Sequence, residues 1–202
     1  NVSVQGPILA NTVSVDYTTA DGSALAGSDY TLISGTLNFI SSQMISFDQP
    51  ETQTITVPIL NDQIVEAAET FEVRLSNIVA TGATVGFGNN SANATITDDD
   101  SAIIEFNVTS SSGAESVSSA SVQVDLSSQS ASAVTVDYAI TGTATGGGTD
   151  YMLADGRLTI PANTSSANIT IASIVDDALV EGDESVIVTL SNPTGATLGS
   201  DI

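Results

Sequence analysis

Two copies of one residue pattern run along this chain, and this internal repeat constrains the fold more than any other feature. The segment Val13–Tyr17 (VSVDY) recurs as Val134–Tyr138 (VTVDY). Further matches follow in the same order in both copies: GSDY at 27–30 with GTDY at 148–151, GTLNF at 35–39 with GRLTI at 156–160, Asn61-Asp62 with Asp176-Asp177, and LSN at 75–77 with LSN at 190–192. The 202 residues therefore predict two tandem domains, which we expect at residues 1–100 and 101–202.

Within each copy the apolar residues recur at every second position, as in Val13, Val15 and Tyr17. Thr and Ser fill many of the intervening positions, and clusters of Gly, Asn, Asp and Ser separate the runs. This period is typical of half-buried β-strands, and no segment shows a helical period. We therefore predict an all-β chain in which each copy is an antiparallel β-sandwich of about seven strands.

The strand inventories of the two copies differ at their ends. The run Ile103–Val108 opens copy two and has no counterpart in copy one, whereas Ala92–Thr97 closes copy one and has no counterpart in copy two. We therefore expect the first copy to lack its first strand and the second copy to lack its last. Two interpretations remain open: a segment of a longer array, or a subunit whose missing strand comes from a neighbouring chain.

The charge of the chain is almost purely anionic. It carries 24 Asp and Glu residues against two cations, Arg74 and Arg157, with no Lys, His or Cys, and its net charge is −22. Two arginines cannot displace the counterions of nucleic acid, so this class of partner is excluded, and an anionic membrane surface would repel the chain. No apolar run is long enough to predict membrane insertion. Without His, Cys or Lys, the remaining chemistry is that of carboxylates and hydroxyls, which favours hard cations such as Ca²⁺ over soft metals.

The acids gather in two clusters, and the clusters carry the candidate metal ligands. Crowded carboxylates repel one another unless a cation neutralises them, and Ca²⁺ accepts six to eight oxygen ligands in irregular loop geometry. The ligand candidates in copy one are Asp29, Asp62, Glu66, Glu69, Asp98, Asp99 and Asp100, and those in copy two are Glu115, Asp150, Asp176, Asp177, Glu181 and Glu184.

Each of these acids also has an ordinary structural interpretation. Asp29 and Asp150 stand before Tyr in a turn, where an aspartate often accepts backbone hydrogen bonds. The run Asp98–Asp100 also fits a solvated linker, and the glutamates also fit exposed loop charges. Asp16 and Asp137 lie late in a predicted strand, so we expect them to be structural rather than ligating.

Together, the motifs GSDY, LSN and Thr97–Asp100 resemble the Calx-β domain, and the resemblance covers essentially the whole chain as two incomplete copies. It implies an immunoglobulin-like sandwich with several Ca²⁺ ions at one end, near the junction with the next domain. Carried over, it assigns Asp29, the acids between Asp62 and Glu69 and the terminal run Asp98–Asp100 to calcium in copy one. In copy two it assigns the matching acids, with Glu115 after the first strand. Asn61 stands where copy two keeps Asp176, so copy one has one charge fewer there.

The sequence thus predicts a non-enzymatic, calcium-binding structural or adhesive module of an extracellular or cell-surface protein of bacterial type. Calcium would stiffen the junction between the copies, and the expected partners are calcium, further copies of the chain and a surface glycan or protein. The alternative is a subunit of a donor-strand-exchanged extracellular filament. A calcium-dependent carbohydrate-binding module is a further alternative, and a calcium sensor of the exchanger type shares the same fold. A glycosidase is disfavoured, because the acids repeat in both copies and no aromatic sugar platform accompanies them.

Overall fold

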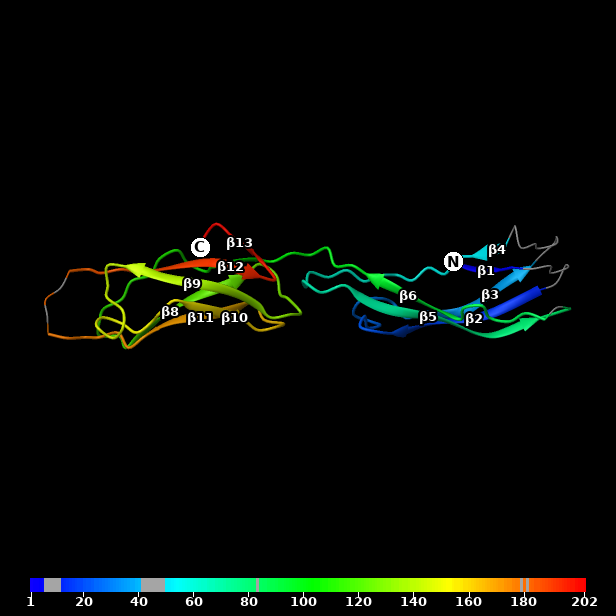
Figure 1. Cartoon of the computed structure of the whole chain (residues 1–202), viewed down its shortest axis with the longest axis horizontal. Coiled ribbons are helices and arrows are strands. Elements are labelled where there is room, and N and C mark those ends of the chain that lie inside the picture. The colour runs from blue at the N-terminus through cyan, green and yellow to red at the C-terminus, as the bar shows by residue number, and fades with distance from the viewer. Residues whose placement is uncertain (6–11, 41–49, 83, 179, 181) are drawn as a thin grey trace. The chain divides into compact units, whose positions relative to one another are not determined.

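The computed structural model describes residues 1–5, 12–40, 50–82, 84–178, 180 and 182–202, and it divides the chain into two compact units (Figure 1). Unit 1 comprises Asn1–Asp62 and Ala68–Thr97, and unit 2 comprises Gln63–Ala67 and Asp98–Ile202. All regular structure in the described ranges is β-strand, which confirms the predicted all-β class. The same ranges contain no helix that could cross a membrane.

Unit 1 contains a two-stranded and a four-stranded antiparallel sheet. Its strands are β1 (Val2–Val4), β2 (Thr12–Asp21), β3 (Ser34–Ile40), β4 (Glu51–Gln53), β5 (Glu69–Ala80) and β6 (Ser91–Ile96). The small sheet pairs β1 with β4, and the large sheet has the order β3-β2-β5-β6. Residues of β1, β2 and β3 share one buried cluster, so the two sheets form a sandwich.

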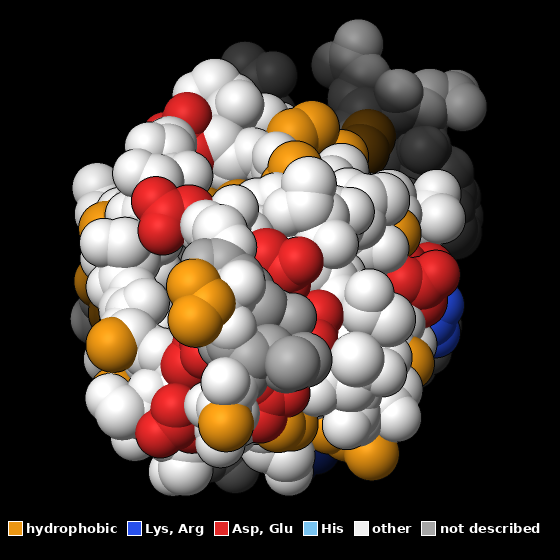
Figure 2. All heavy atoms as spheres, turned by 90° about the vertical axis from the view of Figure 1, so that its left-hand side faces the viewer, with side chains coloured by type: hydrophobic (Ala, Val, Ile, Leu, Met, Phe, Trp, Pro, Cys, Tyr) orange, Lys and Arg blue, Asp and Glu red, His pale blue; other side chains and the backbone are white. Residues whose placement is uncertain are grey.

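Unit 2 repeats this arrangement with two strands more in the first sheet and one fewer in the second. Its strands are β7 (Ile103–Phe106), β8 (Ser119–Leu126), β9 (Val134–Gly142), β10 (Gly156–Ile160), β11 (Ser166–Ala172), β12 (Val186–Thr194) and β13 (Thr197–Leu198). The sheets have the orders β11-β8-β7-β13 and β10-β9-β12, and β13 pairs with β7 in parallel. The end of this unit that carries the segment between β11 and β12 faces the viewer in Figure 2.

Because β1 and β4 pair as β8 and β11 do, the two units can be compared strand by strand. Among the described residues, β7 has no counterpart in unit 1 and β6 has none in unit 2, as predicted. The short strand β13, which pairs with β7, has no counterpart in unit 1 either. The prediction of two tandem antiparallel sandwiches is likewise confirmed.

Two of the repeated motifs have structural explanations. Gly35 pairs across the sheet with Tyr17, and a Cβ on this glycine would lie 2.8 Å from the Tyr17 hydroxyl oxygen. Gly156 faces Tyr138 in the same way, with the hydroxyl oxygen 2.7 Å from the added Cβ. The tyrosine ring therefore covers the glycine, which explains why both residues recur together.

The LSN motif marks a β-bulge in each unit. Asn77 and Asn192 adopt left-handed φ angles of 48° and 47°, a conformation that asparagine tolerates better than most residues. The Asn77 side-chain amide donates a hydrogen bond to Asp16 Oδ2 at 2.9 Å, and Asn192 donates to Asp137 at 3.4 Å. Hydrogen bonds from Thr36 and Asn77 lower the pKa of the Asp16 carboxyl, and the bond from Arg157 lowers the pKa of Asp137. Both aspartates therefore have hydrogen-bonding partners on neighbouring strands.

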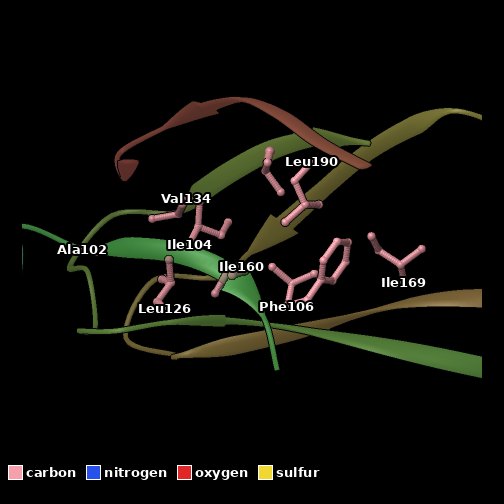
Figure 3. Close-up of a cluster of buried hydrophobic side chains, with 10 residues drawn as sticks. Ala102, Ile104, Phe106, Leu126, Val134, Ile160, Ile169 and Leu190 are labelled. Atoms are coloured by element: carbon pink, nitrogen blue, oxygen red, sulfur yellow. The ribbon is translucent and has the colours of Figure 1, made fainter. Parts of the chain in front are cut away.

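The core of unit 2 lies between its two sheets. Figure 3 shows the side chains of Ile104, Phe106 and Leu126 from one sheet beside those of Val134, Ile160 and Leu190 from the other. All of them are buried, and none carries a polar group. Because the chain has no disulfide, this apolar burial has to offset the conformational entropy of folding.

We predict that Ile104→Ala lowers the free energy of unfolding of unit 2 by about 3 kcal/mol, since it leaves a cavity in the core. The matched control is Ile103→Ala on the same strand, because Ile103 is 43% exposed whereas Ile104 is 0% exposed. Urea denaturation measures both losses. Equal losses would contradict the assignment of the buried face of β7.

Candidate metal centre

Three carboxylates of the first repeat converge in the structure. Asp29, Glu66 and Glu69 each offer an oxygen, and these oxygens lie within 4.8 Å of one another. Asp29 follows β2, Glu66 precedes β5, and Glu69 is the first residue of β5. All three side chains are half-buried. In the ranges that the structure describes, no other three acids come as close.

Asp29 is held by the turn that contains it. The Leu25 amide donates a hydrogen bond to Asp29 Oδ2 at 2.6 Å, and the amides of Ser28 and Asp29 both donate to the Leu25 carbonyl oxygen. The Leu60 amide donates to the Asp29 carbonyl oxygen at 3.0 Å. A carboxylate has two oxygens, so Asp29 can accept a hydrogen bond from its own turn and also bind a metal ion. The structural and the ligand interpretations of Asp29 are therefore compatible.

A buried aromatic pair supports the residues beside two of the acids. Tyr30 and Phe71 stack with ring centroids 4.4 Å apart and an angle of 18° between the rings, and both side chains are buried. Tyr30 is adjacent to Asp29, and Phe71 lies two residues after Glu69. Packing of this pair therefore restricts the backbone at both acids.

The Tyr30 hydroxyl reaches a further aspartate, Asp21, at the end of β2. It donates a hydrogen bond to Asp21 Oδ1 at 2.7 Å, and the Ala26 amide donates to the same oxygen at 2.9 Å. These bonds lower the pKa of the Asp21 carboxyl, whereas burial and the nearby Asp21 charge raise the pKa of the Tyr30 hydroxyl. Asp21 was not among the predicted site residues. The sequence feature that could have pointed to Asp21 is a difference between the repeats, because the equivalent position of copy two is Gly142.

Backbone hydrogen bonds also hold the segment that carries Glu66. The Glu66 amide donates to Asp98 Oδ2 at 3.0 Å. The Val65 amide donates to the Gln129 carbonyl oxygen, and the Val65 carbonyl oxygen accepts from the Ala131 amide and from the Ser130 hydroxyl. The segment Gln63–Ala67 is thus held within unit 2 by hydrogen bonds. The side-chain carboxylate of Asp98, a predicted ligand, accepts one of them from a backbone amide.

The remaining candidates do not join a group of three acids among the described residues. In copy one these are Asp62, Asp98, Asp99 and Asp100, and in copy two Glu115, Asp150, Asp176, Asp177 and Glu184. Glu181 lies outside the described residues.

Copy two nevertheless repeats the turn around its aspartate. The Thr145 amide donates to Asp150 Oδ2 at 2.5 Å, and the Val175 amide donates to the Asp150 carbonyl oxygen as Leu60 does to Asp29. Asp176, Asp177 and Glu184 are exposed, and Figure 2 shows acidic side chains scattered between apolar and uncharged ones on this end of unit 2.

The donor set of the first repeat fits Ca²⁺. Ca²⁺ binds carboxylate oxygens at about 2.3–2.6 Å, so two of its ligands lie up to roughly 5 Å apart. The three oxygens, which lie within 4.8 Å of one another, are close enough to bind one such ion. The chain contains no His or Cys, so soft metals find no preferred ligand. Three carboxylates would supply part of the six to eight oxygens that Ca²⁺ takes.

Known proteins match this chain over most of its length. The Calx-beta domain model matches residues 1–100 and again residues 97–199. Sodium/calcium exchanger 1 of Bos taurus is 34% identical over 208 residues, which are 94% of this chain and 20% of the exchanger. Sodium/calcium exchanger 3 of Mus musculus is 31% identical over 210 residues, with 94% and 22% covered. This chain therefore spans about a fifth of the length of these relatives.

Among solved structures, the crystal structure of CBD12 from CALX1.2 is 28% identical and covers 93% of this chain and 70% of its own. Its TM-score to this chain is 0.43.

The prediction of an extracellular or cell-surface location is wrong. The relatives that match over most of the chain are sodium/calcium exchangers, and this match contradicts the predicted location. The prediction rested on the absence of Cys and on the weak affinity that is usual for extracellular calcium modules. Neither argument distinguishes one compartment from another, because a Cys-free aliphatic core and a site of oxygen ligands work equally well in both.

We predict that Glu69→Gln weakens calcium binding by the first repeat at least tenfold, since it removes one charge from the group of three. Glu72→Gln is the matched control: Glu72 lies on the same strand, already pairs with Arg74 at 2.7 Å and is not part of the group. Isothermal titration calorimetry compares the two variants. Equal affinities would rule out Glu69 as a ligand.

Proposed function

The chain belongs to the Calx-beta domain family, as its motifs predicted, and on this premise we propose that it is a non-enzymatic module in which calcium restricts the relative motion of two tandem domains. Calx-beta domains bind Ca²⁺, which confirms the predicted ligand. We keep residues 1–100 and 101–202 as the proposed domain limits.

One observation carries the proposal for the first repeat: the convergence of Asp29, Glu66 and Glu69 within 4.8 Å. These three residues would hold the ion, which would supply positive charge at a point where carboxylates otherwise repel one another. Asp98, Asp99 and Asp100 remain proposed ligands, and Asp62 is proposed on the same loop. For copy two we propose Glu115, Asp150, Asp176, Asp177, Glu181 and Glu184.

The proposed restriction of motion follows from how the acidic segment is held. Val65 and Glu66 are hydrogen-bonded to Gln129, Ser130, Ala131 and Asp98, all within unit 2. A cation held by Glu66 would add to these bonds and restrict the same segment further.

The similarity to sodium/calcium exchangers favours a regulatory role for calcium binding by the two domains. The match to the exchangers covers both copies, at 94% of this chain, so the tandem arrangement itself is shared. We propose that the pair senses calcium for a larger protein that contains it. An adhesive or glycan-binding role presupposed an extracellular location and is not part of the proposal.

Assembly by strand exchange between copies of the chain is the alternative function that the sequence left open. A strand like β7 from one chain would then complete the β1–β4 sheet of another. Size-exclusion chromatography separates the two functions, because exchange produces oligomers that grow with concentration and a sensor module remains monomeric.

We predict that calcium raises the melting temperature of the chain, because a ligand that binds only the folded state stabilises it by linkage. At a calcium concentration 100 times Kd the gain is about 2.7 kcal/mol per site. Differential scanning calorimetry in EDTA and in calcium measures it, with Glu69→Gln as the variant expected to lose most of the shift and Glu72→Gln as the control. An identical melting curve in EDTA and in millimolar calcium would contradict the calcium-binding function.

A further inference from the structure

Asp21 closes the turn that presents Asp29. Its Oδ1 accepts hydrogen bonds from the Ala26 amide at 2.9 Å and from the Tyr30 hydroxyl at 2.7 Å. One partner lies in the middle of the turn and the other lies at its end, directly after Asp29. A single carboxylate oxygen therefore fixes two points of the segment that carries a proposed ligand.

The bond to Tyr30 matters because of where the tyrosine ring lies. The ring is fully buried and stacks on Phe71, which lies two residues beyond Glu69. The hydroxyl bond to Asp21 holds the outer end of this ring. Through Tyr30, Asp21 thus acts on the backbone of both Asp29 and the strand that starts at Glu69.

The second repeat provides an internal comparison. Gly142 occupies the position equivalent to Asp21, and a Cβ there would lie 2.0 Å from the Ser185 carbonyl oxygen. No side chain fits at that position, so copy two has to hold its Asp150 turn without this carboxylate. In the described residues Asp150 belongs to no group of three acids, whereas Asp29 does.

We propose that Asp21 is a positioning residue of the first repeat: it sets the calcium affinity by holding the turn of Asp29 and the ring of Tyr30, and does not itself bind the ion. The proposal rests on the calcium-binding function proposed above. It also assigns the two repeats different affinities, because only the first has this support.

The test compares two substitutions of Asp21 by calcium titration calorimetry on the whole chain, with melting in EDTA as a second readout. Asp21→Ala removes the acceptor, and we expect about tenfold weaker binding at the first repeat. Asp21→Asn keeps an acceptor oxygen at the same place, so its affinity should stay within about threefold of wild type. Asp155→Ala is the matched control, because Asp155 also precedes a glycine and accepts one backbone hydrogen bond, from Ile140 in unit 2.

The outcomes separate the possible explanations. Wild-type affinity in Asp21→Ala, with only a lower melting temperature in EDTA, would overturn the proposal in favour of a purely structural role. Equal losses in Asp21→Ala and Asp21→Asn would overturn it in favour of a charge effect. A wild-type chain that binds no calcium would instead refute the proposed function itself.

A second variant keeps the test decisive if Asp21→Ala does not fold. Tyr30→Phe removes only the hydroxyl and keeps the ring on Phe71, so we expect binding about threefold weaker with the fold intact. Unchanged affinity in this variant would overturn the proposal as well.

Discussion

The repulsion among three carboxylates is the constraint on which the rest of this account depends. Two like charges about 4 Å apart repel by about 1 kcal/mol in water and by about 4 kcal/mol at the effective dielectric constant near a protein surface. Asp29, Glu66 and Glu69 bring three such oxygens within 4.8 Å of one another. Backbone hydrogen bonds and the buried Tyr30–Phe71 pair keep these acids together. A bound cation would replace this repulsion by attraction, so the same arrangement would then stabilise the folded state.

The sandwich supports this arrangement by fixing where the loops start. In each unit the tyrosine-over-glycine pair and the asparagine bulge hold the central strand β2 or β9 against its neighbours. The turn after the central strand then carries Asp29 or Asp150, and its backbone bonds are nearly the same in both units. The repeats share this frame, but Asp21 and Gly142 differ at its edge. The two candidate sites therefore differ through single residues at the edge of a shared strand arrangement.

Much of the fold could be predicted from the sequence, because strand period and repeat are local properties. Val13, Val15 and Tyr17 alternate in sequence, and the structure places the two valines in the core. The site was harder to predict, since distances between loops depend on tertiary packing. Glu66 and Glu69 were among thirteen candidates, and nothing in the spacing distinguished them from Asp62, which lies on the same loop. Asp21 was missed because its function depends on a hydroxyl nine residues away that only the folded turn brings close. The cellular location of the protein could not be inferred from the sequence, because amino-acid composition does not distinguish the compartments.

A calcium titration followed by backbone amide NMR tests the central claim most directly. We expect the largest shifts at residues 24–30 and 64–70, the two segments that bring Asp29, Glu66 and Glu69 together, with the changes saturating as the site fills. Saturable shifts confined to other segments, or no saturable shifts at all, would contradict the assignment of calcium to this group.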